Sequence, residues 1–191
     1  MFRLLNGLRN SLQAGRARKV RLILMDVDGT LTDGTIYVLP DGEEIKAYHV
    51  HDGLGIFLAH LAGLKTGIIT GKTSRALAIR ASRLGLQELH QGILDKKEVL
   101  LDIARRHKLD LAEIAFVGDD LGDLEVMRLV GFPAAVADAH PAIRKVARYR
   151  CSRPGGGGAV REVIEFILKA QGRWKELATR AADIKRSSQT Q

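Results

Sequence analysis

Cysteine is almost absent from this chain, whose 191 residues include a single one, Cys151. A lone cysteine cannot form an internal disulfide, and a free thiol suits the reducing interior of a cell, so we expect a cytoplasmic protein. Long apolar runs are missing too, and no uninterrupted stretch approaches the roughly 20 residues that a transmembrane helix needs. The sequence therefore predicts no membrane span.

Acidic residues are missing from residues 1–21, which carry six basic ones. Residues 173–191 hold five basic and two acidic residues, so the formal net charge of +8 lies at the two ends of the chain. The body between them is close to neutral. Basic ends on a neutral body do not form a nucleic-acid-binding face, so we expect no nucleic-acid partner.

Residues 1–19 form a basic arm in which Phe2, Leu5, Leu8 and Leu12 stand near helical spacing. The arm lacks the long apolar core of a secretory signal. One interpretation is a short helix or frayed arm that packs on the body or on a neighbouring subunit. The alternative is weak binding to a membrane surface, which basic amphipathic helices can show. We favour the packed arm.

The rest of the chain suits one domain, over residues 20–172, followed by a basic tail over residues 173–191. Short apolar runs alternate with helical stretches, and no internal repeat is present. The runs cover residues 20–25, 64–70, 114–118 and 132–138, and the helical stretches cover 52–63, 74–85, 96–107 and 123–131. Such alternation is typical of an α/β fold with helices on both faces of a parallel sheet. We therefore predict a Rossmann-like three-layer domain.

Local signals indicate where several helices begin and end. Two polar residues ahead of helical stretches are predicted N-caps, and two glycines after such stretches are predicted stops. The N-caps are Asp52 and Ser74, and the stops are Gly85 and Gly131. Asp110 followed by Glu113 is typical of a capping box, and Pro141 after His140 is typical of a first helical position.

A hairpin over residues 34–50 interrupts the alternation, because two extended runs flank a Pro-Asp-Gly turn. We expect it to project over the strand ends or outward to another subunit, where oligomerisation would cover its edges. His49 and His51 lie on one face of the expected second strand. They form either a metal pair or a solvated or subunit-facing pair, and we favour the second interpretation.

Polar side chains follow the apolar runs at the points where the strands are expected to end. Ligands bind at the carboxyl ends of strands in open parallel sheets. The residues at these points are Asp26, Asp28, Thr70, Lys96, Asp119, Asp120 and Asp123. Converging carboxylates suit a hard cation such as Mg²⁺, and a lysine and a threonine beside it suit a phosphoryl group. An aspartate there can act as a nucleophile, and an acid two residues on can transfer protons.

The motifs resemble those of the haloacid dehalogenase superfamily, and within it the 3-deoxy-D-manno-octulosonate 8-phosphate phosphatase group. The matching stretches are "DVDGTLTDGTIY", "GEEIKAYHVHDGLGI", "IITGK", Lys96, "VGDDLGD", "VADAHP" and "GGGGAVREV". Their order and spacing cover roughly residues 20–172. The resemblance implies a Mg²⁺-dependent phosphatase of an acidic sugar phosphate, acting in lipopolysaccharide biosynthesis.

By this resemblance, Asp26 is the nucleophile and Asp28 the general acid/base. Thr70 and Lys96 hold the phosphoryl group, and Gly71, Lys72 and Arg80 are further candidates for substrate binding. Mg²⁺ is expected to bind the Asp26 carboxylate, the Asp28 main-chain carbonyl and Asp119, with Asp120 and Asp123 nearby. The hairpin is too short for a large cap domain, and the resemblance implies a homotetramer whose hairpins cover neighbouring sites.

Two departures from the group leave the sugar open. Lys72 stands where these phosphatases typically carry arginine, and Gly157 stands at the arginine position of the glycine-rich segment. Lysine cannot replace the bidentate fork of arginine. A sister group that acts on nine-carbon ulosonate 9-phosphates of the sialic-acid type resembles this chain in scaffold and varies at these positions, so the resemblance leaves such a sugar as an alternative substrate. Residues 154–158 are either a flexible linker or a loop that closes a site.

Two alternatives belong to other functional classes. A non-catalytic relative would keep the scaffold, but such relatives usually lose one of the residues that this chain retains. A receiver-type signalling domain also clusters acids with Mg²⁺ and a lysine. It would need neither Asp28 nor the hairpin.

Overall fold

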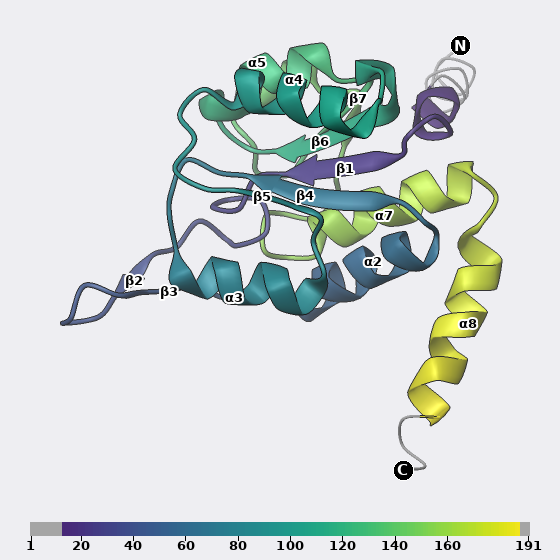
Figure 1. Ribbon diagram of the computed structural model, residues 1–191, viewed down its shortest axis with the longest axis horizontal. Coiled ribbons are helices and arrows are strands. Elements are labelled where there is room, and N and C mark those ends of the chain that lie inside the picture. Colours follow the sequence, from purple (N-terminus) through teal and green to yellow (C-terminus); the bar gives the residue numbers. More distant parts are fainter. Residues whose placement is uncertain (1–12, 188–191) are drawn as a thin grey trace.

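Six parallel strands form the central sheet of the computed structural model, which describes residues 13–187 and the side chains of residues 13–180 (Figure 1). The strands follow the order β5-β4-β1-β6-β7-β8. They are β1 (Leu22–Met25), β4 (Lys65–Ile69), β5 (Glu88–His90), β6 (Ile114–Gly118), β7 (Phe132–Ala135) and β8 (Tyr149–Arg150). Every residue of β1 is buried, as expected for a central parallel strand with both faces covered.

Helices cover both faces of the sheet, with α4 and α5 above it and α2, α3 and α7 below it in Figure 1. The helices are α2 (Val50–Leu61), α3 (Arg75–Leu84), α4 (Lys96–His107), α5 (Leu124–Leu129), α6 (Pro141–Val146), α7 (Ala159–Ala170) and α8 (Trp174–Ser187). Two 3₁₀ turns, η1 (Leu111–Glu113) and η2 (Leu121–Asp123), flank β6. The predicted three-layer α/β fold without a large cap domain is confirmed.

The register of the central strands determines which loops meet. β1 pairs on one side with β4 and on the other with β6, so that Met25 stands beside both Ile68 and Val117. The three strands therefore end at the same edge of the sheet. Asp26 follows β1 directly and Thr70 follows β4 directly, while Asp119 follows β6. These are the positions that the sequence marks as candidates.

Most of the predicted helix ends are confirmed. The hydroxyl of Ser74 accepts a hydrogen bond from Leu77 N at the start of α3, and Gly85 ends that helix with a φ of 67°. Asp110 and Glu113 form the capping box. His140 precedes α6 as its N-cap, with Pro141 in the first turn.

The predicted cap at Asp52 is wrong. His49 is the N-cap of α2, while Asp52 is buried in the first turn and accepts a hydrogen bond from Arg161 N at 2.7 Å, near the start of α7. The N-cap of α7 is Gly158, which has no side chain to offer, so Asp52 satisfies an N–H group of that helix. Burial raises the pKa of Asp52, despite this hydrogen bond.

The predicted stop at Gly131 is also wrong. Helix α5 ends at Leu129, and its C-cap Val130 is extended. A Cβ atom on Gly131 would collide with the backbone of Ala112. This glycine therefore allows a close approach of two backbone segments.

The hairpin is shorter than the sequence indicates. Its strands β2 (Tyr37–Val38) and β3 (Glu44–Ile45) pair antiparallel over two residues each. The chain leaves the ladder after Ile45, and Val50 already begins α2. The placement of His49 and His51 on a strand is therefore wrong. They lie at the start of α2, with ring centroids 4.8 Å apart.

The first described residues pack on the body, and so does the first half of α8. Residues 13–17 are helical and Ala17 is fully buried. Gln171 donates a hydrogen bond to the carbonyl of Val20 at 2.8 Å. The apolar positions expected between Phe2 and Leu12 lie outside the described residues. Helix α8 leaves the body in Figure 1, although Leu177 in its first half is buried.

Among the described helices, none combines the length and apolarity needed to cross a bilayer.

Candidate active site

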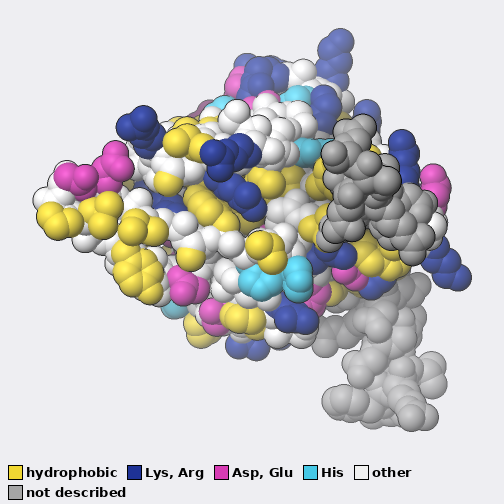
Figure 2. All heavy atoms as spheres, turned by 90° about the horizontal axis from the view of Figure 1, so that it is seen from below, with side chains coloured by type: hydrophobic (Ala, Val, Ile, Leu, Met, Phe, Trp, Pro, Cys, Tyr) yellow, Lys and Arg dark blue, Asp and Glu magenta, His cyan; other side chains and the backbone are white. Residues whose placement is uncertain are grey.

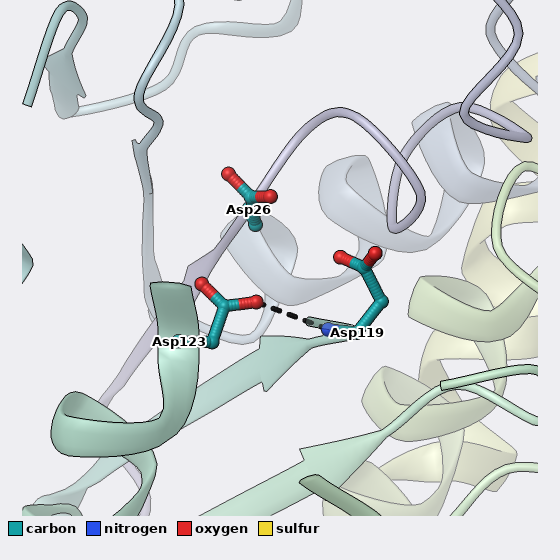
Figure 3. A group of neighbouring side chains, drawn as sticks. All are labelled: Asp26, Asp119 and Asp123. Carbon is teal, nitrogen blue, oxygen red and sulfur yellow. Dashed lines mark hydrogen bonds between the residues drawn. The ribbon is translucent and has the colours of Figure 1, made fainter. Parts of the chain in front are cut away.

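Three carboxylates converge where β1 and β6 end (Figure 3). Asp26, Asp119 and Asp123 each offer an oxygen that lies within 4.8 Å of the others. The backbone N–H of Asp26 donates to the carbonyl of Val117 at 3.0 Å, which ties the end of β1 to β6. Asp123 lies in η2, and its Oδ2 accepts a hydrogen bond from Asp119 N at 3.0 Å.

Lys96 lies between two of these carboxylates. It is the first residue of α4, and its Nζ lies 2.8 Å from Asp26 Oδ1 and 2.7 Å from Asp123 Oδ1. Burial lowers the pKa of this ammonium group, but the charges of Asp123 and Asp26 more than offset that effect, and the pKa lies above its usual value. Lys96 is therefore positively charged at neutral pH.

The cluster still carries an excess of negative charge. Burial, together with the charges of Asp123 and Asp26, raises the pKa of Asp119 to about 7, although a hydrogen bond from Thr30 opposes this. Burial likewise raises the pKa of Asp123 to about 6, against the attraction of Lys96. When all three carboxylates are ionised, one ammonium group leaves two negative charges uncompensated, and a divalent cation would balance them.

The donor set fits such a cation. Both oxygens of Asp123 are already engaged, one by Lys96 and the other by Asp119 N. Asp26 Oδ1 is buried and has no hydrogen-bond partner apart from its ion pair with Lys96. The carboxylates of Asp26 and Asp119 are thus the ones left to face a metal ion.

The side chain of Asp28 does not join this cluster. It forms an ion pair with Lys46, a residue just after β3 that the sequence analysis did not single out. Its main-chain carbonyl belongs to the loop that follows β1. The Asp28 side chain thus lies outside the carboxylate cluster and is paired with Lys46 instead.

Two further residues that sequence reasoning missed shape the position of Asp119. Thr30 is fully buried, and its hydroxyl donates a hydrogen bond to Asp119 Oδ1 at 2.9 Å. Gly29 has a φ of 90°, and a Cβ atom there would collide with Asp119 Oδ2. Both residues lie within the "DVDGT" motif, which is the sequence feature that could have identified them.

Of the other candidates for substrate binding, Thr70, Gly71 and Lys72 follow β4, and Arg80 lies in α3. Thr70 is buried, and its N–H donates to the His90 carbonyl at 2.9 Å, while Gly71 and Lys72 are exposed. The Arg80 guanidinium lies over the Tyr48 ring, with its carbon 5.8 Å from the ring centroid. Within the described residues, no hydrogen bond or ion pair joins these side chains to the carboxylate cluster.

Residues 154–158 pack on the loop after β1 of the same chain. Gly156 N donates to the Thr30 carbonyl at 3.0 Å, and Gly155 N donates to Asp138 Oδ1 at 3.0 Å. A Cβ atom on Gly155 would collide with the Gly29 carbonyl. The interpretation as a flexible linker is therefore wrong, since these glycines are needed for backbone-to-backbone contact.

Comparisons with known proteins agree with this geometry. A family model for haloacid dehalogenase-like hydrolases matches residues 62–163. The chain is 42% identical over 161 residues to the 3-deoxy-D-manno-octulosonate 8-phosphate phosphatase of Escherichia coli K12, which covers 84% of this chain and 86% of that protein.

Solved structures of similar proteins carry the same name. The phosphatase from Yersinia pestis is 41% identical with a TM-score of 0.84, covering 86% of this chain and 89% of that one. The enzyme from Moraxella catarrhalis, in complex with a magnesium ion, a phosphate ion and KDO, is 38% identical with a TM-score of 0.86, covering 88% and 97%. These matches rule out the receiver-domain interpretation, and the chain belongs to the haloacid dehalogenase-like hydrolase family.

Proposed function

We propose that this protein is a Mg²⁺-dependent phosphatase that hydrolyses 3-deoxy-D-manno-octulosonate 8-phosphate to the free sugar acid and phosphate, in lipopolysaccharide biosynthesis. The observation that carries the proposal is Lys96, which lies within 2.8 Å of both Asp26 and Asp123 beside an excess of carboxylates. Such a site suits an anionic phosphoryl group and a cation. The identity of 42% with the Escherichia coli phosphatase supports the choice of substrate.

The reaction has two halves. In the first, a carboxylate oxygen of Asp26 bonds to phosphorus, the bond from phosphorus to the sugar oxygen breaks, and Asp28 gives that oxygen a proton. In the second, a water oxygen bonds to phosphorus, Asp28 takes the water proton, and Asp26 leaves as a carboxylate. Lys96 holds the Asp26 carboxylate in place through their ion pair.

Thr70 and the backbone N–H groups of Gly71 and Lys72 are proposed to hold the phosphoryl oxygens. The proposed Mg²⁺ ligands are the Asp26 carboxylate, the Asp28 main-chain carbonyl and the Asp119 carboxylate. When bound, Mg²⁺ offsets the repulsion between the anionic nucleophile and the phosphoryl group. Asp123 holds Lys96 and the Asp119 backbone rather than the ion.

Phosphate release with Mg²⁺ tests this proposal. The assay compares octulosonate 8-phosphate, a nine-carbon ulosonate 9-phosphate and simple sugar phosphates. We expect the highest kcat/KM with the first. Lys72 and Gly157 favour the nine-carbon substrate as a second candidate, and a preference for it would keep the chemistry while changing the sugar. Absence of phosphate release from every substrate would contradict the enzyme function itself.

Lys72→Arg tests whether this exposed position faces the sugar carboxylate. Arginine offers a bidentate fork, so we expect the KM for the acidic sugar phosphate to fall several-fold, on the order of 3- to 10-fold, with kcat little changed. Lys97→Arg is the matched control, because Lys97 pairs with Glu125 at 2.9 Å on the surface. Equal KM values for the two variants would place Lys72 away from the carboxylate.

The proposal includes a homotetramer and a cytoplasmic location, which the single buried thiol of Cys151 suits. Apolar side chains gather on the projecting hairpin (Figure 2), where Tyr37 is 58%, Val38 66% and Ile45 50% exposed. An exposed apolar patch of this kind favours burial against another subunit. The hairpin is the element that we propose to form the contact.

Val38→Glu should therefore weaken the assembly. A charge placed in an apolar contact is costly to bury, so we expect light scattering at micromolar concentration to report dimers or monomers. Ala112→Glu is the control, because Ala112 is exposed in η1 at the opposite end of β6. A monomeric wild-type protein would contradict the tetramer.

A further inference from the structure

Lys46 is a buried cation that the reaction described above leaves without a role. Its side chain is only 3% exposed, and its ammonium group pairs with Asp28 Oδ1 and lies 3.6 Å from Glu44 Oε2. A buried ammonium group is costly unless it is paired, so this lysine is held by its two carboxylate partners. One of these partners is the proposed general acid/base.

The backbone directs Lys46 inward. Along residues 44–48, partly buried and exposed residues alternate, as expected for an extended segment. Glu44, Lys46 and Tyr48 therefore face the body, while Ile45 and Ala47 face solvent. Burial, and then the charge of Asp28, raise the pKa of Tyr48 to about 12. The segment from hairpin to helix thus presents its inner face to the general acid.

Asp28 has little else to orient its side chain. The side chain is 22% exposed, and within the described part of the chain its ion pair is with Lys46. The other lysine of the site, Lys96, forms ion pairs with Asp26 and Asp123. Each of the two proposed catalytic aspartates therefore has a lysine of its own.

We propose that Lys46 is a positioning residue, which holds the Asp28 carboxyl group where it can protonate the leaving sugar oxygen and later accept the proton of water. This inference rests on the proposed phosphatase function. Lys46 does not contact the phosphoryl group in this role. Its contribution passes through Asp28 and depends on how much the leaving oxygen needs a proton.

Substrates whose leaving groups differ in their need for a proton distinguish a positioning role of Lys46 from a general structural role. An alkyl phosphate such as a sugar phosphate needs a proton on its leaving oxygen, whereas the p-nitrophenolate of p-nitrophenyl phosphate leaves without one. Lys46→Met keeps the length and apolar stem of the side chain and removes its charge. We expect its kcat on the sugar phosphate to fall on the order of 100-fold, with KM within about threefold of the wild type.

The same variant should release p-nitrophenolate in a single turnover at a rate within about threefold of the wild type, because that step does not need the acid. Lys46→Arg should restore most of the sugar-phosphate kcat. Lys169→Met is the matched control, since Lys169 pairs with Glu165 on α7, and both of its rates should be unchanged. Thermal unfolding and light scattering confirm that the variants are folded and assembled.

A double-mutant cycle completes the test. If Lys46 acts through Asp28, then Lys46→Met added to Asp28→Asn should slow the sugar phosphate no further than Asp28→Asn alone. Equal losses on the two substrates, or additive losses in the cycle, would overturn the proposal. The test requires any alkyl phosphate that the wild type hydrolyses, so it can succeed or fail even if octulosonate 8-phosphate is not the substrate.

Discussion

Asp26→Asn is expected to reduce turnover on the order of 10⁴-fold or more, because the amide cannot form the phosphoryl bond that the first half of the reaction needs. The fold should persist. Asn occupies nearly the same volume, and Lys96 retains its contact with Asp123 at 2.7 Å. The variant also removes one of three clustered carboxylates, so without metal it should unfold at the same or a higher temperature than the wild type.

Phosphate release and thermal unfolding, each measured with and without Mg²⁺, check both parts of this prediction. Asp110→Asn is the matched control, because Asp110 caps η1 at the opposite end of β6 and asparagine caps helices equally well. Its activity should equal that of the wild type. Turnover above about one per cent in Asp26→Asn would contradict the aspartyl-phosphate route.

Gly29→Ala is expected to have the second largest effect. Alanine at a φ of 90° is strained by about 1–3 kcal/mol, and its Cβ atom would collide with Asp119 Oδ2. Asp119 must then move, although Thr30 holds its other oxygen at 2.9 Å. We expect the Mg²⁺ concentration for half-maximal activity to rise, and kcat/KM to fall, on the order of 10- to 100-fold.

Gly63→Ala isolates the backbone strain. Gly63 has a φ of 70°, and nothing lies within 4 Å of the Cβ position. It should therefore lower the unfolding temperature, but by no more than Gly29→Ala does, while leaving the Mg²⁺ requirement unchanged. A normal Mg²⁺ requirement in Gly29→Ala would show that Asp119 is not a ligand.

The sequence was sufficient to predict the layers of the fold and the meeting of Asp26, Lys96, Asp119 and Asp123 at one edge of the sheet. Long periodic stretches predicted α2, α3 and α4 to within two residues. Strand β5 was missed because Glu88–His90 is short and mostly polar, and period-2 alternation has no meaning over so few residues. β8 was missed for the same reason.

Two other failures of the sequence reasoning share a cause, which is contact between residues far apart in the chain. Asp52 looked like a cap for its own helix, but its partner is Arg161. The pairing of Lys46 with Asp28 depends on how the hairpin folds back, which no local pattern encodes. Local signals predict what a segment prefers, and the tertiary structure decides which donor a carboxylate meets.

The glycines that pack behind the loop after β1 also bear on when the protein can mature during its synthesis. The ribosome makes the chain from its amino end, so Asp26, Lys96, Asp119 and Asp123 all emerge before Gly155. The loop that carries Asp26 and Asp28 nevertheless acquires its contacts with Gly155 and Gly156 only after those residues have been translated. A nascent chain therefore holds every residue of the proposed chemistry before the loop that carries Asp26 has all its contacts, and activity should appear only after Gly155 and Gly156 have been translated.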